Sequence, residues 1–212
     1  MVVRPDSFAV LLPVKSPGSG KSRLSALPDA DRRRLAAAFA ADAVAVCTTA
    51  PGVALVVVIS DDADFAASLA GAGVLTCADP GAGLNAALRL GADVAHDRAP
   101  DLQPVALLAD VPALTAADLA LALDAARTAA GPCFVEDADG TGTTLYTAAY
   151  DAFDPRFGAG SAAAHRAAGA LSINGPLLTL RRDVDDLAGL AEAVALGVGT
   201  ATATALPEAL RA

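Results

Sequence analysis

The sequence predicts one α/β domain in which a mostly parallel central sheet is flanked by helices. Apolar, β-branched runs of strand length alternate with longer segments of helical periodicity along the 212 residues, and this alternation is typical of parallel sheets. No linker, repeat or charge block divides the chain, so we expect a single domain over residues 1–212. Hydrophobic residues make up 54% of the chain but aromatic residues only 4%. The core is therefore expected to consist mainly of Ala, Val and Leu.

The first elements follow from local patterns. Residues 8–12 are an apolar run that predicts a buried strand. Residues 29–48 begin with acidic residues and then place apolar residues at helical spacing, which predicts an amphipathic helix. Residues 53–59 are a continuous β-branched run, as in a strand covered on both faces. The polar residues 60–62 that follow can cap a helix through residue 72.

The middle of the chain continues the alternation. Residues 74–77 predict a short strand, and a turn rich in Gly leads from it to a helix over residues 84–95. Residues 104–109 are a buried apolar run that ends in Asp110. After a bend, Thr115 is placed to cap a helix that extends to residue 129.

The last third predicts shorter elements. Two strands joined by a polar turn rich in Gly, a loop, a helix, a last strand and a final helix follow in that order. Their ranges are 133–136, 143–146, 153–160, 161–170, 177–180 and the helix that ends at 196. Residues 197–212 are mainly Ala and Thr and are predicted to form a loosely ordered tail.

Composition and charge exclude several classes of function. The formal net charge of −9 argues against general nucleic-acid binding. The chain contains no apolar run of membrane-spanning length, and residues 1–5 do not form a signal peptide. Cys47, Cys77 and Cys133 are odd in number and far apart, which indicates reduced thiols in the cytoplasm. We therefore expect a cytoplasmic protein that acts on small molecules, with no membrane or nucleic-acid partner.

The loop after the first strand is the best candidate for binding phosphates. Lys15 and Lys21 enclose glycines and serines, so the loop can offer backbone N–H groups and positive charge to a polyanion. Gly20, Lys21 and Ser22 match the second half of a P-loop, but Lys15 stands where that motif requires glycine. A P-loop and a simple surface turn are the alternatives to another kind of nucleotide-binding loop, which we favour.

Aspartates after later strands are candidates for a metal site. Asp110 follows a buried strand at the edge where ligands of such sheets bind, and carboxylates there commonly hold Mg²⁺. Asp183 and Asp185 follow the last predicted strand and can supply a second carboxylate. Helix capping is the alternative for all three residues.

A second glycine loop and a few polar residues complete the candidates. Residues 157–161 place glycines directly before a helix, so Gly158 and Ser161 could meet a phosphate or carboxylate, with hydroxyls such as that of Thr143 nearby. An ordinary loop with Ser161 as helix cap is the alternative. Asn85, at a helix start, could bond a ribose or base or only begin the helix. The histidines His96 and His165 are predicted to be solvated and not catalytic.

The chain offers no convincing nucleophile or general base. A phosphate monoester is largely dianionic near neutral pH, since its second pKa is about 6. Such a phosphate can attack a phosphorus atom without a base, provided that it is positioned and that the charge of the leaving group is stabilised.

Four parts of the sequence resemble those of a known family. The similarity lies in residues 12–15 with 21–24, 83–87, 108–114 and 157–165, and it extends over nearly the whole chain from residue 8 to about residue 196. These segments look like those of the guanylyltransferases of deazaflavin coenzyme F-420 biosynthesis, which use phosphoenolpyruvate or 2-phospho-L-lactate. The first segment is shared more loosely with molybdenum-cofactor guanylyltransferases and sugar nucleotidyltransferases.

The resemblance implies a single-domain, Rossmann-like nucleotidyltransferase fold and assigns roles by motif. In this assignment one set of residues binds GTP, a second binds Mg²⁺ and a third binds the phosphorylated acceptor, with Lys15, Lys21 and Asp110 as the catalytic residues. The three sets are Leu12, Pro13, Lys15, Lys21 and Asn85 for GTP, Asp110, Asp183 and Asp185 for Mg²⁺, and Thr143, Gly158 and Ser161 for the acceptor. Ala109 departs from the glycine that often precedes the metal aspartate in related enzymes, and Thr143 and Thr144 are not distinguished by the motif.

We therefore expect a guanylyltransferase that moves GMP from GTP to phosphoenolpyruvate or 2-phospho-L-lactate and releases pyrophosphate. With phosphoenolpyruvate the product would be enolpyruvyl-diphospho-5′-guanosine. The alternatives are a nucleotidyltransferase with molybdopterin or a sugar phosphate as acceptor, and a P-loop-like kinase or nucleotide-binding protein. The oligomeric state is left open, with a homodimer as one expectation.

Overall fold

A computed structural model describes residues 7–18, residue 24 and residues 26–211. Its centre is a sheet whose described strands run in the order β3-β2-β1-β4-β6-β5-β7. All neighbouring strands are parallel except at β6, which is antiparallel to β4 and β5. The strands are β1 (Phe8–Val14), β2 (Val53–Ser60), β3 (Val74–Ala78), β4 (Gln103–Leu107), β5 (Cys133–Glu136), β6 (Thr143–Thr147) and β7 (Leu171–Ser172). The predicted, mostly parallel α/β sheet is confirmed.

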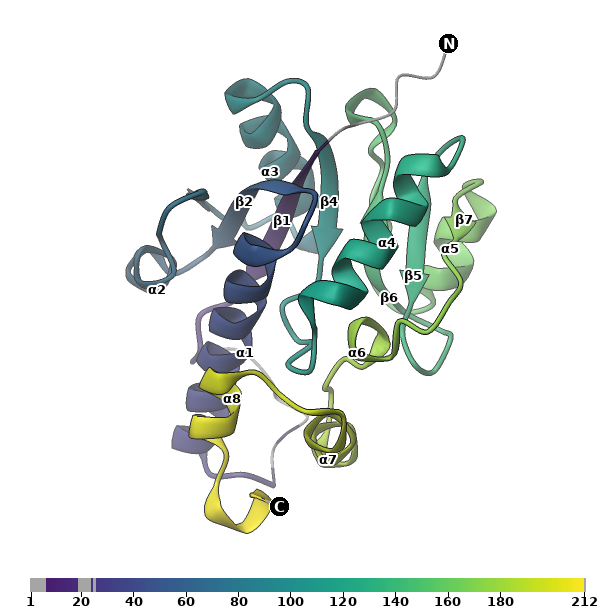
Figure 1. The fold of residues 1–212 in the computed structure, drawn as a ribbon. Coiled ribbons are helices and arrows are strands. Elements are labelled where there is room, and N and C mark those ends of the chain that lie inside the picture. The colour runs from purple at the N-terminus through teal and green to yellow at the C-terminus, as the bar shows by residue number, and fades with distance from the viewer. Residues whose placement is uncertain (1–6, 19–23, 25, 212) are drawn as a thin grey trace.

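Helices cover both faces of this sheet (Figure 1). They are α1 (Asp29–Thr49), α2 (Ala63–Ser68), α3 (Leu84–Arg98), α4 (Ala116–Thr128), α5 (Ser161–Ala167), α6 (Leu178–Arg181), α7 (Leu187–Leu196) and α8 (Thr200–Ala205), with short 3-10 turns at Tyr150–Ala152 and Glu208–Leu210. None of the helices in the described part of the chain is long and apolar enough to cross a membrane.

The alternation of side chains along β1 explains the two covered faces. Phe8, Val10 and Leu12 pack into a core that includes α1 and α4, whereas Ala9 and Leu11 pack into a second core beneath α3. Successive side chains of a strand point to opposite faces, so a strand buried on both sides must be apolar throughout. This is why β1 and β2 are recognisable in the sequence as unbroken apolar runs.

One predicted strand and two predicted helix ends are wrong. The segment predicted as the last strand, residues 177–180, is the helix α6, and the last strand is instead β7. A four-residue apolar run cannot distinguish strand from helix by periodicity alone, and here Leu177 and Leu180 are buried at helical spacing. The helices expected to reach residues 72 and 170 end as α2 at Ser68 and as α5 at Ala167.

The predicted loosely ordered tail is also wrong for most of its length. Residues 200–205 form α8, which lies beside α1 (Figure 1). The carboxylate of Asp42 on α1 accepts hydrogen bonds from the backbone N–H groups of Ala201 at 2.9 Å and Thr202 at 2.8 Å. Leu206 then joins a third core with Phe39 of α1 and with Val184. The end of the chain is therefore anchored next to the segment that carries Asp183 and Asp185.

Candidate active site

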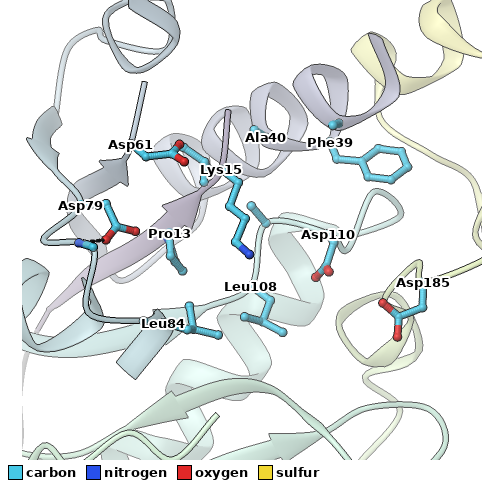
Figure 2. A pocket seen from close by; sticks show the side chains of 15 residues that line it. Pro13, Lys15, Phe39, Ala40, Asp61, Asp79, Leu84, Leu108, Asp110 and Asp185 are labelled. Carbon is cyan, nitrogen blue, oxygen red and sulfur yellow. Dashed lines mark hydrogen bonds between the residues drawn. The ribbon is translucent and has the colours of Figure 1, made fainter. Parts of the chain in front are cut away.

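A pocket of 510 Å³ lies at the carboxyl edge of the sheet, at the switch point between β1 and β4 (Figure 2). On one side of β1 the sheet continues through β2 and β3, and on the other through β4. The connections after β1 and β4 therefore diverge and leave a crevice, where ligands of open α/β sheets bind. The pocket is lined by Pro13, Val14, Lys15, Ala36, Phe39, Ala40, Asp61, Asp79, Gly81, Gly83, Leu84, Leu108, Ala109, Asp110 and Asp185.

Among the described residues that line the pocket, the basic one is Lys15, at the end of β1. Lys15 is exposed and its side chain extends into the pocket (Figure 2), next to the partly exposed Pro13. The loop that follows is held at its start because the Ser16 N–H donates to the Asp61 carboxylate at 2.7 Å. Leu12 is fully buried and is not among the residues that line the pocket, so its contact with a nucleotide stays a prediction. Lys21, together with Gly20 and Ser22, lies outside the described residues.

The three candidate metal ligands lie on two neighbouring segments. Asp110 and Asp185 line the pocket (Figure 2), and the Val184 N–H donates to the backbone oxygen of Asp110 at 2.9 Å. This hydrogen bond brings Asp183 close enough for the charge of Asp110 to act on it. Burial and, after it, the negative charge of Asp110 raise the pKa of Asp183 to about 6.

These carboxylates fit a hard divalent cation. Like-charged oxygens brought together at a partly buried position favour a bound cation over mutual repulsion, and carboxylate oxygens are the ligands that Mg²⁺ prefers. The preformed geometry is incomplete, since within the described ranges no group of three or more acidic, histidine or cysteine side chains is arranged as a metal cluster.

The capping alternative for the aspartates is wrong. The N-cap of α4 is Thr115, whose hydroxyl accepts from the Asp118 N–H at 3.2 Å. The N-cap of α7 is Asp186, which accepts from the Gly189 N–H at 2.9 Å. Asp110, Asp183 and Asp185 are thus not needed as caps.

Asn85 joins the pocket to the second glycine loop. Its side-chain amide donates to the backbone oxygen of Phe157 at 3.0 Å, and its side-chain oxygen accepts from the Phe157 N–H at 2.8 Å. Both polar atoms of the side chain are therefore engaged with the loop, and contact with a nucleoside stays a prediction. Because Leu84 lines the pocket and Gly158 follows Phe157, these bonds hold the glycine loop at the edge of the pocket.

The three residues predicted to bind the acceptor lie together beyond this edge. Thr143 and Ser161 are only 3% and 2% exposed, whereas Gly158 is exposed. Gly158 and Gly160 have φ values of +135° and +70°, which side-chain-bearing residues rarely adopt. Gly160 is the N-cap of α5, so the alternative in which the Ser161 side chain caps the helix is wrong.

The N–H groups at the start of α5 are less available than we expected. The N–H of Ser161 donates to the Gly158 oxygen at 3.1 Å, and that of Ala162 to the Thr141 oxygen at 3.2 Å. A ligand there would depend more on the side chains of Thr143 and Ser161 than on a row of exposed backbone donors.

His165 is not solvated, which corrects the sequence-based prediction. It is fully buried, its Nδ1 lies 3.0 Å from the Thr143 hydroxyl and its Nε2 accepts from the Arg156 N–H at 2.9 Å. His96 is half-buried and stacks on Tyr150, with ring centroids 3.8 Å apart. The partners of both histidines, Thr143, Arg156 and Tyr150, are distant from them in the sequence, so spacing along the chain could not reveal these contacts.

Sequence reasoning also missed Asp79. This carboxylate follows β3 just as Asp61 follows β2 and Asp110 follows β4, so the same rule would have found it. Its Oδ1 accepts from the Gly81 N–H at 2.7 Å, which fixes the acid at the pocket wall.

Comparison with known proteins decides the family. A family model described as "Guanylyl transferase CofC like" matches residues 8–204. The chain belongs to the CofC-like guanylyl transferase family. The predicted resemblance is confirmed, and the P-loop alternative is wrong. Among the described residues, the first α-helix is α1, which begins at Asp29.

Relatives within this CofC-like family match almost end to end. A phosphoenolpyruvate guanylyltransferase of Salinispora arenicola is 46% identical over 214 residues, covering 96% of this chain and 97% of that protein. The protein of the same name from Streptomyces coelicolor is 46% identical over 200 residues, covering 92% and 94%.

Solved structures support the nucleotidyltransferase-type fold of the CofC-like chain. A 4-diphosphocytidyl-2C-methyl-D-erythritol synthase matches with a TM-score of 0.59 at 15% identity, covering 92% of this chain and all of that one. Rv0371c of Mycobacterium tuberculosis, in complex with manganese, matches with a TM-score of 0.51 at 20% identity, covering 89% and 99%. At these identities the likeness concerns the fold.

Proposed function

We propose that this enzyme transfers GMP from GTP to phosphoenolpyruvate and releases pyrophosphate. The observation that carries the proposal is the Asn85–Phe157 link, which joins a pocket with Lys15 and Asp110 to a glycine loop suited to a small phosphorylated acid. Relatives that match almost the whole chain bear the name phosphoenolpyruvate guanylyltransferase. The product would be enolpyruvyl-diphospho-5′-guanosine, which suits the F-420 pathway implied by the family.

GTP would occupy the pocket at the switch point. Lys15 and Lys21 would neutralise the triphosphate, and Leu12 and Pro13 would border the nucleotide. The guanine edge carries two N–H donors, at N1 and at the 2-amino group, and a carboxylate can accept from both. We assign this contact to Asp79, which lines the pocket and is held there by the Gly81 N–H. The side chain of Asn85 is bonded to Phe157, so Asn85 would act on the nucleoside indirectly, by holding the neighbouring Leu84 at the pocket wall.

Mg²⁺ would be held by Asp110 and Asp183, with Asp185 beside them. When bound, the cation would offset the negative charge of the triphosphate. The partly buried Asp183 gains most from such a neutralising ligand, because burial and Asp110 disfavour its charged form.

Phosphoenolpyruvate would bind against Thr143, Gly158 and Ser161. The exposed, left-handed Gly158 lets an anion approach the backbone closely, and the two hydroxyls can donate hydrogen bonds to phosphate or carboxylate oxygens. The surrounding helix α5 is rich in Ala, so a large pterin or sugar acceptor would find few polar partners here.

The chemical step is then an in-line displacement. An oxygen of the acceptor phosphate forms a bond to the α-phosphorus of GTP, the bond from that phosphorus to the bridging oxygen breaks, and pyrophosphate leaves with the electron pair. The attacking phosphate needs no deprotonation, since it is largely dianionic near neutral pH. Lys15 and Lys21 stabilise the charge that develops on the leaving pyrophosphate.

Incubation with GTP and Mg²⁺ tests the proposal. Pyrophosphate is measured with phosphoenolpyruvate, 2-phospho-L-lactate, a sugar phosphate or no acceptor, and mass spectrometry identifies the product. We expect pyrophosphate and a GMP adduct with phosphoenolpyruvate, at least tenfold faster than with the other acceptors. GDP and a phosphorylated acceptor would instead indicate a kinase, and a faster reaction with 2-phospho-L-lactate would change the assigned substrate.

Asp110→Asn is the matched variant for this assay. It keeps the size of the side chain but removes an anionic ligand, so turnover should fall by at least 100-fold while the fold persists. Asp93→Asn, on the exposed face of α3 away from the pocket, is the control and should retain activity. Full activity of Asp110→Asn would remove Asp110 from the site.

A further inference from the structure

His165 is a buried group that the reaction described above leaves without a role. Its ring is stacked on Tyr146, with centroids 4.6 Å apart and planes inclined by 17°. Phe157 approaches it edge-on at 5.4 Å, and Phe134 lies 5.6 Å away. Packing on several sides holds the plane of the imidazole in one orientation.

The hydrogen bonds of His165 determine its tautomer. Nε2 receives a hydrogen bond from the Arg156 backbone N–H at 2.9 Å. A backbone N–H can only donate, so Nε2 must be unprotonated, and in the neutral ring the proton is then on Nδ1. Nδ1–H consequently donates to the Thr143 Oγ1, 3.0 Å away, and the Ser161 backbone oxygen is a second acceptor beside the ring. Turning the ring over would place carbon atoms against both partners.

This tautomer fixes the direction of the Thr143 hydroxyl. Because Oγ1 accepts from His165, its own proton must point away from the imidazole. Thr143 is almost fully buried, and across the described residues its hydroxyl makes no second hydrogen bond. A buried donor of this kind is stabilised by an acceptor, and oxygens of an anionic ligand can provide one.

The same imidazole also holds the start of the glycine loop. Its Nε2 binds the N–H of Arg156, and Asn85 binds both backbone groups of Phe157. Two consecutive residues before Gly158 are thus fixed by side chains from α5 and α3. The hydroxyl of Thr143 and the backbone of Gly158 are positioned by one network.

We propose that His165 is a positioning residue that keeps the Thr143 hydroxyl as an obligate donor toward a phosphate or carboxylate oxygen of the acceptor. The inference rests on the proposed function, because it takes Thr143 and Gly158 as part of the acceptor site. It adds that His165 acts through hydrogen-bond direction and contributes no charge.

The protonation state of the imidazole agrees with this role. Burial, and the positive charge of Arg156, lower the pKa of His165 to about 4, against the opposing effects of the Ser161 backbone and of Asp154. The ring is therefore neutral at the pH of the cytoplasm, as the bond from Arg156 requires.

Nitrogen NMR tests the tautomer without any change at the site. The chain contains two histidines, so ¹⁵N-histidine labelling with a His96→Gln variant assigns both rings. At pH 7 we expect a protonated Nδ1 and an unprotonated Nε2 for His165. A proton on Nε2, or a charged ring, would overturn the inference whatever the activity of the enzyme.

Two substitutions then separate the functions of the two nitrogens. In His165→Asn the side-chain amide can replace Nδ1–H and still donate to Thr143, but nothing accepts from Arg156. In His165→Gln the side chain can reach the Nε2 position and accept from Arg156, but the donor to Thr143 is lost. We expect the KM for phosphoenolpyruvate to rise about tenfold or more in His165→Gln and clearly less in His165→Asn, with the KM for GTP changed less than twofold in both.

A double-mutant comparison completes the test. Thr143→Val removes the hydroxyl and should raise the same KM, and adding His165→Gln to it should raise that KM no further. Thr143→Ser keeps the hydroxyl, so it should raise the KM for phosphoenolpyruvate less than Thr143→Val does, and this pair serves if the His165 variants do not fold. Equal KM values for the Asn and Gln variants, or additive effects with Thr143→Val, would refute the role of His165. An inactive wild type would instead refute the proposed function.

Discussion

Removing the Asp42 carboxylate should destabilise the end of the chain and, through it, the aspartate side of the active site. Asp42 is 8% exposed and accepts from the N–H groups of Ala201 and Thr202 in the first turn of α8. Hydrogen bonds to a charged group contribute about 1.5–3 kcal/mol each, and loss of a helix cap costs about 1–2 kcal/mol. Since the two bonds are offset by burial of the charge, Asp42→Ala should lower the unfolding free energy by about 3 kcal/mol, or the Tm by roughly 6–12 °C.

The effect should reach the site through shared packing. Leu206, directly after α8, lies in the same core as Val184, which stands between Asp183 and Asp185. Loss of α8 from α1 would therefore free the segment that presents these carboxylates. Exchange of the Ala201 and Thr202 amides should rise in step with the loss of stability.

Urea denaturation and hydrogen exchange are the assays, with Asp124→Ala as control. Asp124 is an exposed acid of α4 that pairs with Arg127 at 2.7 Å, and such surface pairs contribute about 0–1 kcal/mol. If Asp42→Ala unfolds at the same urea concentration as Asp124→Ala, or if the Ala201 and Thr202 amides stay protected, the anchoring argument is refuted.

Three further predictions concern the site. Lys15→Ala should lower kcat/KM for GTP by about 100-fold, because roughly 3 kcal/mol of charge stabilisation is lost. Calorimetry should show that the affinity for guanosine, which has no phosphate, is unchanged. A parallel loss of guanosine affinity would contradict a role of Lys15 in phosphate binding. Asp79→Asn should shift preference from GTP toward xanthosine triphosphate by roughly 10- to 100-fold in a competition assay, because an amide can donate to the xanthine C2 oxygen; unchanged selectivity would place the base elsewhere. Burial is the main reason that the pKa of His165 is lowered from 6.5 to about 4; Arg156 lowers it further and Asp154 opposes the shift. Between these two pH values the unfolded chain binds more protons than the folded protein, so folding stability rises with pH. The stability advantage of wild type over His165→Asn should therefore be complete above about pH 6.5 and fall by about 2–3 kcal/mol toward pH 4. Comparing the two proteins cancels the opposing effect of Asp183, and a pH-independent difference in their urea midpoints would contradict the buried, neutral ring.

Much of the fold follows from local pattern because the central strands are buried on both faces. β1 and β2 had to be continuous apolar runs, and Asp61 and Asp110 could be placed at one edge of the sheet, since parallel strands end together. Short elements could not be predicted in this way. A run as brief as residues 177–180 satisfies strand and helix equally, and only its packing made it α6.

The sequence by itself determined the class of fold, the pocket edge with Lys15 and Asp110, and the family. These depend on residues close together in the chain, or on motifs that survive as short strings. The tertiary structure alone decided which side chains meet across the chain: Asn85 with Phe157, His165 with Thr143 and Arg156, and Asp42 with the start of α8. A polar residue in an alanine-rich helix looks solvated until its partner is known, because burial and hydrogen bonding are set by long-range packing and leave no periodic signal in the sequence.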